Sequence, residues 1–99
     1  MIVIGICDGD AAVCILISEY VNQYRLDTGQ NVQVLSYNAG DKLIRHYPME
    51  MDLIFLEIPF TSLNGIEIAR HIRQTDPYVN IVFLTTLLNH VLEAYEVLK

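Results

Sequence analysis

The stretch DLIFLEIPFTSLNGIEIARHIRQTDP, residues 52–77, decides the fold of this 99-residue chain. It opens on an apolar run from Asp52 to Leu56, a pattern typical of a strand buried on both faces of a parallel sheet. Apolar residues then recur at helical spacing from Asn64 to Thr75, and Asp76-Pro77 ends that helix. A strand, a loop and a helix in this order predict one βα unit.

The same unit repeats on both sides of this stretch. Strands are expected at residues 1–7, 32–36, 52–56 and 81–85, and helices from residue 10 or 11 to about 24 and at residues 40–47, 64–75 and 87–98. Asp10 is a candidate N-cap for the first helix, and Thr28-Gly29 is its expected stop. The chain is therefore an alternating string of four βα units, which predicts an α/β fold with an open parallel sheet.

Composition points to one packed domain over residues 1–99, because 53% of the residues are hydrophobic and only 18% are charged. The formal net charge of −6 argues against direct binding of nucleic acid. The start MIVIGIC lacks the basic residues of a signal peptide, and the apolar runs are too short to span a membrane. We expect a cytoplasmic protein without a membrane segment.

Acidic and hydroxyl side chains stand where the predicted strands end. Asp8 follows the first strand, Glu57 the third, and Thr85 closes the fourth. The carboxyl ends of parallel strands meet at one edge of a sheet, so these residues converge if the three strands are neighbours. We expect an acidic pocket of Asp8, Asp10 and Glu57 with Thr85 beside it, although Asp10 also fits the role of N-cap.

Residues 52–77, together with Asp8, Asn64-Gly65 and Thr85, resemble a response-regulator receiver domain, and most of all the receivers that precede LytTR-type DNA-binding domains. The resemblance implies a flavodoxin-like sheet with strand order 2-1-3-4 and a role in two-component signalling. It also implies a histidine kinase as phosphate donor and DNA binding only through a separate output domain. In that family the position of Glu57 holds the phosphoacceptor Asp, and the hydroxyl at Thr85 contacts the phosphate.

The chain departs from the family pattern at several positions. Gly9 stands where the family has a second acid that binds Mg²⁺, and Pro59 comes two residues before the usual proline position, Thr61. Glu57 is one methylene longer than Asp, and in-line phosphoryl transfer tolerates little misplacement. We therefore expect no productive phosphorylation and no required cofactor, with Mg²⁺ held at most weakly by Asp8 and Glu57. The Glu57 carboxylate would then imitate an aspartyl phosphate in part.

The resemblance also implies that the fifth strand, its lysine and the fifth helix are missing from this chain, which ends at Lys99. The apolar strand at residues 81–84 then becomes a sheet edge, and such edges pair with other chains. We expect self-association through this edge. The expected function is that of a receiver that takes no phosphate and regulates an output domain or partner through protein contacts.

An enzyme is the alternative. Asp8-Gly9-Asp10 resembles the DxD motif of haloacid-dehalogenase-type phosphatases, which are Mg²⁺-dependent. There the first Asp is the nucleophile and the second is the general acid/base. The three-residue match is short, and Ala11-Ala12 opens a helix where that motif continues with a turn, so we expect a protein that is not an enzyme.

Overall fold

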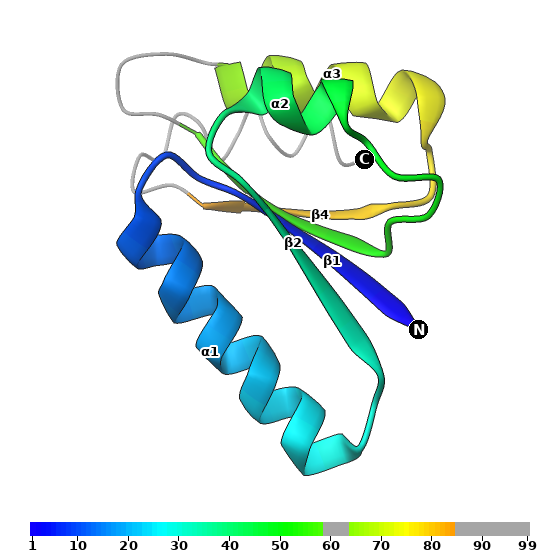
Figure 1. Cartoon of the computed structure of the whole chain (residues 1–99). Helices are drawn as coiled ribbons and strands as arrows, with labels where there is room; N and C mark the ends of the chain where they lie inside the picture. The colour runs from blue at the N-terminus through cyan, green and yellow to red at the C-terminus, as the bar shows by residue number, and fades with distance from the viewer. Residues whose placement is uncertain (59–63, 85–99) are drawn as a thin grey trace.

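The computed structural model describes residues 1–58 and 64–84. Four parallel strands, β1 (Ile2–Cys7), β2 (Val32–Tyr37), β3 (Leu53–Glu57) and β4 (Asn80–Leu84), form one sheet in the order β2-β1-β3-β4 (Figure 1). The helices α1 (Ala11–Thr28), α2 (Gly40–Arg45) and α3 (Asn64–Thr75) connect them. The predicted alternation and the strand order 2-1-3-4 are confirmed. The helix expected at residues 87–98 lies outside the described residues.

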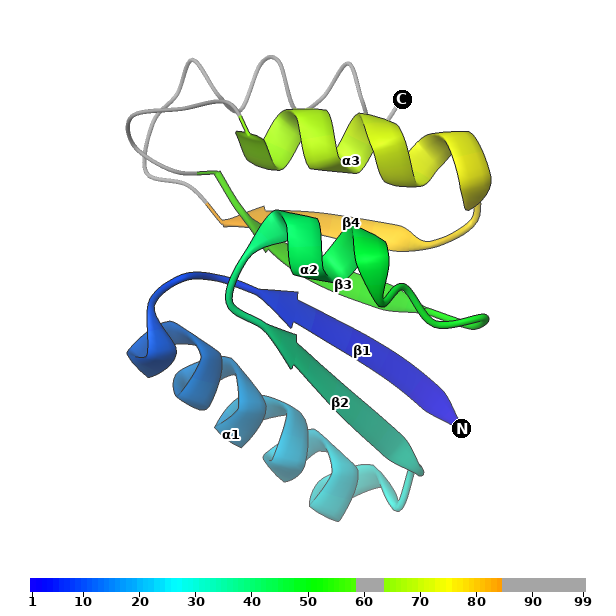
Figure 2. The same cartoon turned by 45° about the horizontal axis from the view of Figure 1, so that its top comes forward.

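The sheet has a helix layer on each face. Figures 1 and 2 show α2 and α3 together on one face and α1 on the other. The main core lies under α2 and α3, where strand residues such as Ile54 and Leu56 pack with Leu43 and Ile72. The cluster on the α1 face is smaller and centres on Ile4, Val21 and Val32. Both faces of a parallel sheet carry apolar residues, so both need cover.

Local chemistry sets the ends of α1 as predicted. The Asp10 carboxylate accepts a hydrogen bond from the Ala12 N–H at 2.9 Å, which is the geometry of an N-cap. Gly29 closes the helix in the left-handed conformation, with φ 71°, and its N–H donates to the Arg25 carbonyl at 2.9 Å. The helix ends at Thr28, the predicted stop, about one turn beyond residue 24, where the apolar spacing ends.

The second helix is shorter than predicted. It ends at Arg45 rather than residue 47, and His46 already has non-helical backbone angles. Pro48 disfavours helical geometry at the residue before it, so the last turn is lost. The strands differ from their predicted bounds by one residue at most ends. No helix in the described part of the chain is long and apolar enough to cross a lipid bilayer.

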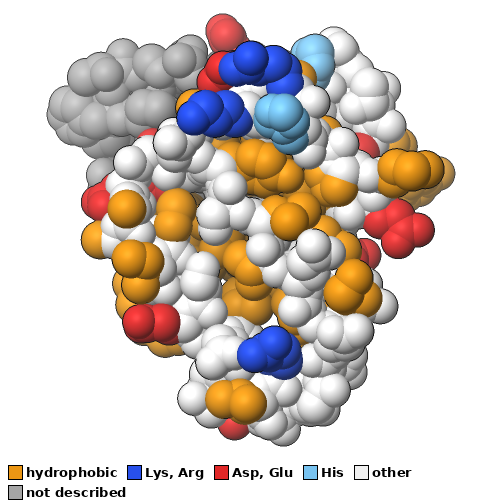
Figure 3. Space-filling view, viewed as in Figure 1, with side chains coloured by type: hydrophobic (Ala, Val, Ile, Leu, Met, Phe, Trp, Pro, Cys, Tyr) orange, Lys and Arg blue, Asp and Glu red, His pale blue; other side chains and the backbone are white. Residues whose placement is uncertain are grey.

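Two side-chain hydrogen bonds tie the amino ends of the strands to the rest of the molecule. The Asp52 carboxylate accepts from the Val3 N–H at 2.8 Å. The Tyr47 hydroxyl, just after α2, donates to the Asp76 carboxylate after α3 at 2.6 Å. On the face shown in Figure 3, hydrophobic side chains gather in the middle and Lys and Arg side chains gather toward α2 and α3.

Candidate functional site

The carboxyl edge of the sheet brings Asp8 and Glu57 together. Cys7 pairs with Leu56 in the β1–β3 register, so the next residues in each strand are neighbours. Asp8 is only 4% exposed, and its Oδ1 accepts a hydrogen bond from the Asp10 N–H at 2.8 Å. Glu57 is the last residue of β3 and is half-buried. The predicted convergence of these two acids is present in the structure.

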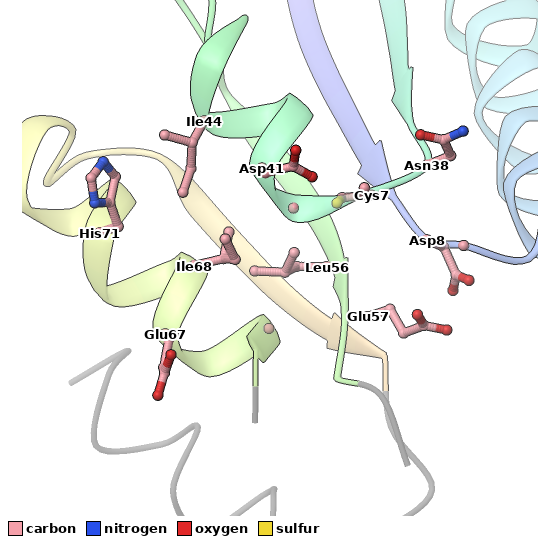
Figure 4. Close-up of a pocket in the computed structure, with 14 residues that line it drawn as sticks. Cys7, Asp8, Asn38, Asp41, Ile44, Leu56, Glu57, Glu67, Ile68 and His71 are labelled. Carbon is pink, nitrogen blue, oxygen red and sulfur yellow. The ribbon is translucent and has the colours of Figure 1, made fainter. Parts of the chain in front are cut away.

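The side chains of Asp8 and Glu57 are hydrogen-bonded to each other. An ionised carboxylate can only accept, so this contact requires a proton on one of the two groups. Burial, the hydrogen bond to Asp8 and the charge of Asp8 raise the pKa of Glu57. The nearby Gly9 N–H favours the charged form of Glu57 and opposes this rise in pKa. Figure 4 shows the two carboxyl groups beside each other at the strand ends.

This contact bears on the idea that Glu57 imitates a phosphorylated aspartate. Such imitation needs a full negative charge directed away from the acidic residues around it. Here the carboxyl group turns toward Asp8 and holds a proton more readily than an ordinary glutamate. The geometry therefore does not support a phosphate-like charge at residue 57.

A cavity of about 580 Å³ opens beside the two acids, between the sheet, α2 and α3 (Figure 4). Glu67 and His71 from α3 and Asp41 from α2 line it with Asp8 and Glu57. Asp10 is not part of its lining, because its carboxylate caps α1. Of the three predicted pocket acids, the structure brings Asp8 and Glu57 together and places Asp10 on the helix beside them. Asp41 and Glu67 were missed because their helices give no sign of facing this edge.

Gly65 holds the start of α3 against the end of β3. A Cβ atom built at this position would lie 2.2 Å from the Glu57 carbonyl oxygen, closer than any side chain can approach. The Asn64-Gly65 pair was noted in the sequence as part of the family likeness. The structure supplies its physical reason, which is a backbone approach that only glycine permits.

The residues at this edge do not fit a Mg²⁺ ion. Mg²⁺ prefers octahedral oxygen ligands with several waters, commonly with one or two ionised carboxylates. The described residues contain no cluster of three or more His, Cys, Asp or Glu side chains that could hold a metal. Gly9 supplies no carboxylate, and the raised pKa of Glu57 makes its carboxyl group a poorer ligand than an ordinary glutamate. The weak Mg²⁺ binding expected of Asp8 and Glu57 stays a prediction. The ligands available at this edge do not favour it.

Thr85 lies outside the described residues. Its predecessor Leu84 pairs with Glu57 in the β3–β4 register, so β4 ends beside the acidic pair. A contact between the Thr85 hydroxyl and Glu57 stays a prediction.

No protein-family model and no curated protein sequence matches the chain. Solved structures do match it. The response regulator DrrB of Thermotoga maritima is 23% identical with a TM-score of 0.80, over 98% of this chain and 42% of that one. The BeF₃-activated DrrB receiver domain is 21% identical with a TM-score of 0.79, over 98% of this chain and 78% of that one.

A third structure agrees with these two. The isolated receiver domain of RcsB from Salmonella enterica serovar Typhimurium is 21% identical with a TM-score of 0.73, over 99% of this chain and 71% of that one. The chain thus spans less than half of the DrrB response regulator structure and most of the DrrB receiver-domain structure. Similarity over nearly the whole chain, with the same sheet order, identifies the architecture. The chain has the flavodoxin-like fold of a response-regulator receiver domain.

Proposed function

We propose that this chain is a signalling receiver module that takes no phosphate at Glu57 and acts through protein contacts. The observation that carries the proposal is the hydrogen bond between Glu57 and Asp8 at the carboxyl edge of the sheet. Glu57 stands where the receiver resemblance expects an ionised aspartate, and its carboxyl group lies against Asp8.

Two features of the pair oppose phosphoryl transfer. A nucleophilic carboxylate must be ionised, and burial together with the neighbouring Asp8 raises the pKa of Glu57, which works against its ionisation. Transfer also needs charge neutralisation by a cation, and the donor set around Gly9 does not fit Mg²⁺. A module of this kind needs no cofactor.

The partners follow from the resemblance and belong to the proposal. A histidine kinase would be recognised at most by docking, without phosphotransfer. An output domain, of the LytTR DNA-binding type in the nearest family likeness, would carry any transcription regulation. The net charge of −6 is consistent with contact to DNA only through such a separate domain.

The phosphatase alternative gains no support from the geometry. It requires Asp10 as a general acid/base, and that carboxylate accepts the Ala12 N–H as the N-cap of α1. Hydrolysis of p-nitrophenyl phosphate with Mg²⁺, lost in Asp8→Asn, would reverse this conclusion.

The test is phosphorylation by acetyl phosphate, and beryllofluoride binding, in the presence of Mg²⁺. Mass spectrometry of the unaltered chain should show no added phosphate, and its NMR spectrum should not change with beryllofluoride. The double variant Gly9→Asp/Glu57→Asp restores both acids of the family pattern. It should bind Mg²⁺ and beryllofluoride, because a Cβ at Gly9 meets only the Asn38 carbonyl at 3.8 Å, an ordinary contact.

The DrrB receiver domain, which has been solved in its BeF₃-activated form, serves as the positive control. The single variant Gly9→Asp separates the effect of the missing acid at position 9 from the effect of glutamate at position 57. It restores the acid that binds the metal and keeps Glu57. Acetyl-phosphate labelling or beryllofluoride binding by the unaltered chain would overturn the proposal.

A further inference from the structure

The two faces of the sheet are covered unequally. On the face of α2 and α3, Ile54 and Leu56 of β3 are almost fully buried. On the other face α1 lies against β1 and β2, and Val21 is its one buried residue. The next strands, β3 and β4, carry apolar side chains on this face as well, and Val82 is 42% exposed there.

In the part of the chain that the structure describes, this face has a groove of about 390 Å³ alongside α1. Ile17, Tyr20 and Tyr24 of α1 form one wall, and Ile4, Leu53 and Phe55 of the sheet form the floor. Among the described residues that line the groove, none is charged. A parallel sheet normally buries both of its faces, so a groove of this kind is a place for another apolar element.

A ridge runs directly beside the groove. Leu16, Tyr20 and Tyr24 are spaced four residues apart, so they line one side of α1. Their exposed fractions are 50%, 70% and 47%. A ridge and a groove that lie next to each other on one face form a self-complementary surface, because a two-fold axis places each ridge in the groove of the other copy.

We propose that the occupant of this groove is a second copy of the chain, which inserts its Leu16–Tyr20–Tyr24 ridge while receiving the same ridge in return. The absence of charged residues from the described lining of the groove favours this face for contact between two copies of an acidic chain. Each copy carries a net charge of −6, and the groove is lined by uncharged residues, so the acids of the two copies need not be buried against each other.

The available area is enough for a weak, closed dimer. The exposed parts of the ridge and groove side chains offer on the order of 1,000 Å² over both copies, which is near the lower bound for a specific interface. Two partly exposed tyrosines at its centre are side chains that commonly dominate binding energy. The same chain could instead pair through the β4 edge, as the sequence predicts, and the two modes use different residues.

Sedimentation velocity of the 99-residue chain from micromolar to submillimolar concentration tests the proposal. The chain should pass from monomer to dimer and stop there, since an isologous contact closes at two. Tyr20→Glu should weaken the dimer at least about tenfold. Added NaCl should strengthen the dimer, because it screens the repulsion between two acidic chains.

Tyr78→Glu is the matched control, since it makes the same change at a tyrosine that is 90% exposed after α3. Leu26→Glu is a second control, at a residue 67% exposed on the opposite side of α1. Both should dimerise like the unaltered chain, and circular dichroism should show all variants folded. A monomer at every concentration, open-ended oligomers, or a dimer unaffected by Tyr20→Glu would overturn the proposal, the last result pointing to pairing through the β4 edge.

Discussion

At residue 57, the carboxyl group of a glutamate lies against the buried Asp8 at the carboxyl edge of the sheet. The sequence predicts that Asp8 and Glu57 meet, because both follow strands expected to be neighbours in a parallel sheet. It does not predict the hydrogen bond between them, which depends on side-chain rotamers and on the 4% exposure of Asp8. Burial and this contact keep the pKa of Glu57 above its ordinary value of 4.5.

This raised pKa predicts how stability changes with pH. Below pH 4.5 the folded and unfolded chains both hold the Glu57 proton, and its contribution to stability is fully present. As the pH rises above 4.5, the unfolded chain releases the proton first, so the contribution is lost while the pH passes through the folded pKa. Urea unfolding from pH 4 to pH 8 should show a smaller fall in unfolding free energy for Glu57→Gln than for the unaltered chain.

The control for this experiment is Glu67→Gln, because Glu67 is exposed and lines the same cavity from α3. In that variant the unfolding free energy should fall with pH as steeply as in the unaltered chain. If it fell as steeply in Glu57→Gln, the pKa of Glu57 would not be raised in the folded chain.

At the scale of elements, the chain ends its helices where backbone chemistry dictates. Asp10 and Gly29 could be identified in the sequence as the ends of α1, since an N-cap acid and a left-handed glycine are local signals. The bounds of α3 were predicted correctly for the same reason. The early end of α2 at Arg45 and the groove beside α1 were not predicted, because they depend on packing between segments far apart in the sequence.

The contact between α3 and β3 gives a prediction for Gly65. Gly65→Ala would put a Cβ atom 2.2 Å from the Glu57 carbonyl oxygen, so the start of α3 must move away from the sheet. We expect a loss of about 2–4 kcal/mol in unfolding free energy, typical of overpacking against backbone. Urea denaturation measures it. Gly9→Ala is the control and should change stability by less than about 1 kcal/mol, because the space around Gly9 is open.

At the scale of the whole molecule, the Tyr47–Asp76 hydrogen bond joins two connections that are 29 residues apart. Burial and the bond to Asp76 raise the pKa of Tyr47, so this tie persists at neutral pH. It links the exit of α2 to the exit of α3 and thereby holds both helices on one face of the sheet.

Removal of this hydroxyl should loosen the helix layer. Tyr47→Phe leaves the Asp76 carboxylate without its 2.6 Å donor and should cost about 1–2 kcal/mol, a fall of several degrees in Tm. Differential scanning calorimetry measures the change. Tyr78→Phe should leave Tm unaltered, since Tyr78 is 90% exposed. Equal Tm values for the two variants would mean that the Tyr47–Asp76 hydrogen bond does not stabilise the packing of α2 and α3.

The place of β1 between β2 and β3 has a consequence for synthesis on the ribosome. β1 precedes both of its partners in the chain, and those partners end only at Tyr37 and Glu57. Its apolar run IVIGIC is therefore translated before both partners: the β2 strand is complete thirty residues after Cys7, and the β3 strand fifty residues after it. During that interval the nascent strand is a natural substrate for chaperones that bind short hydrophobic segments.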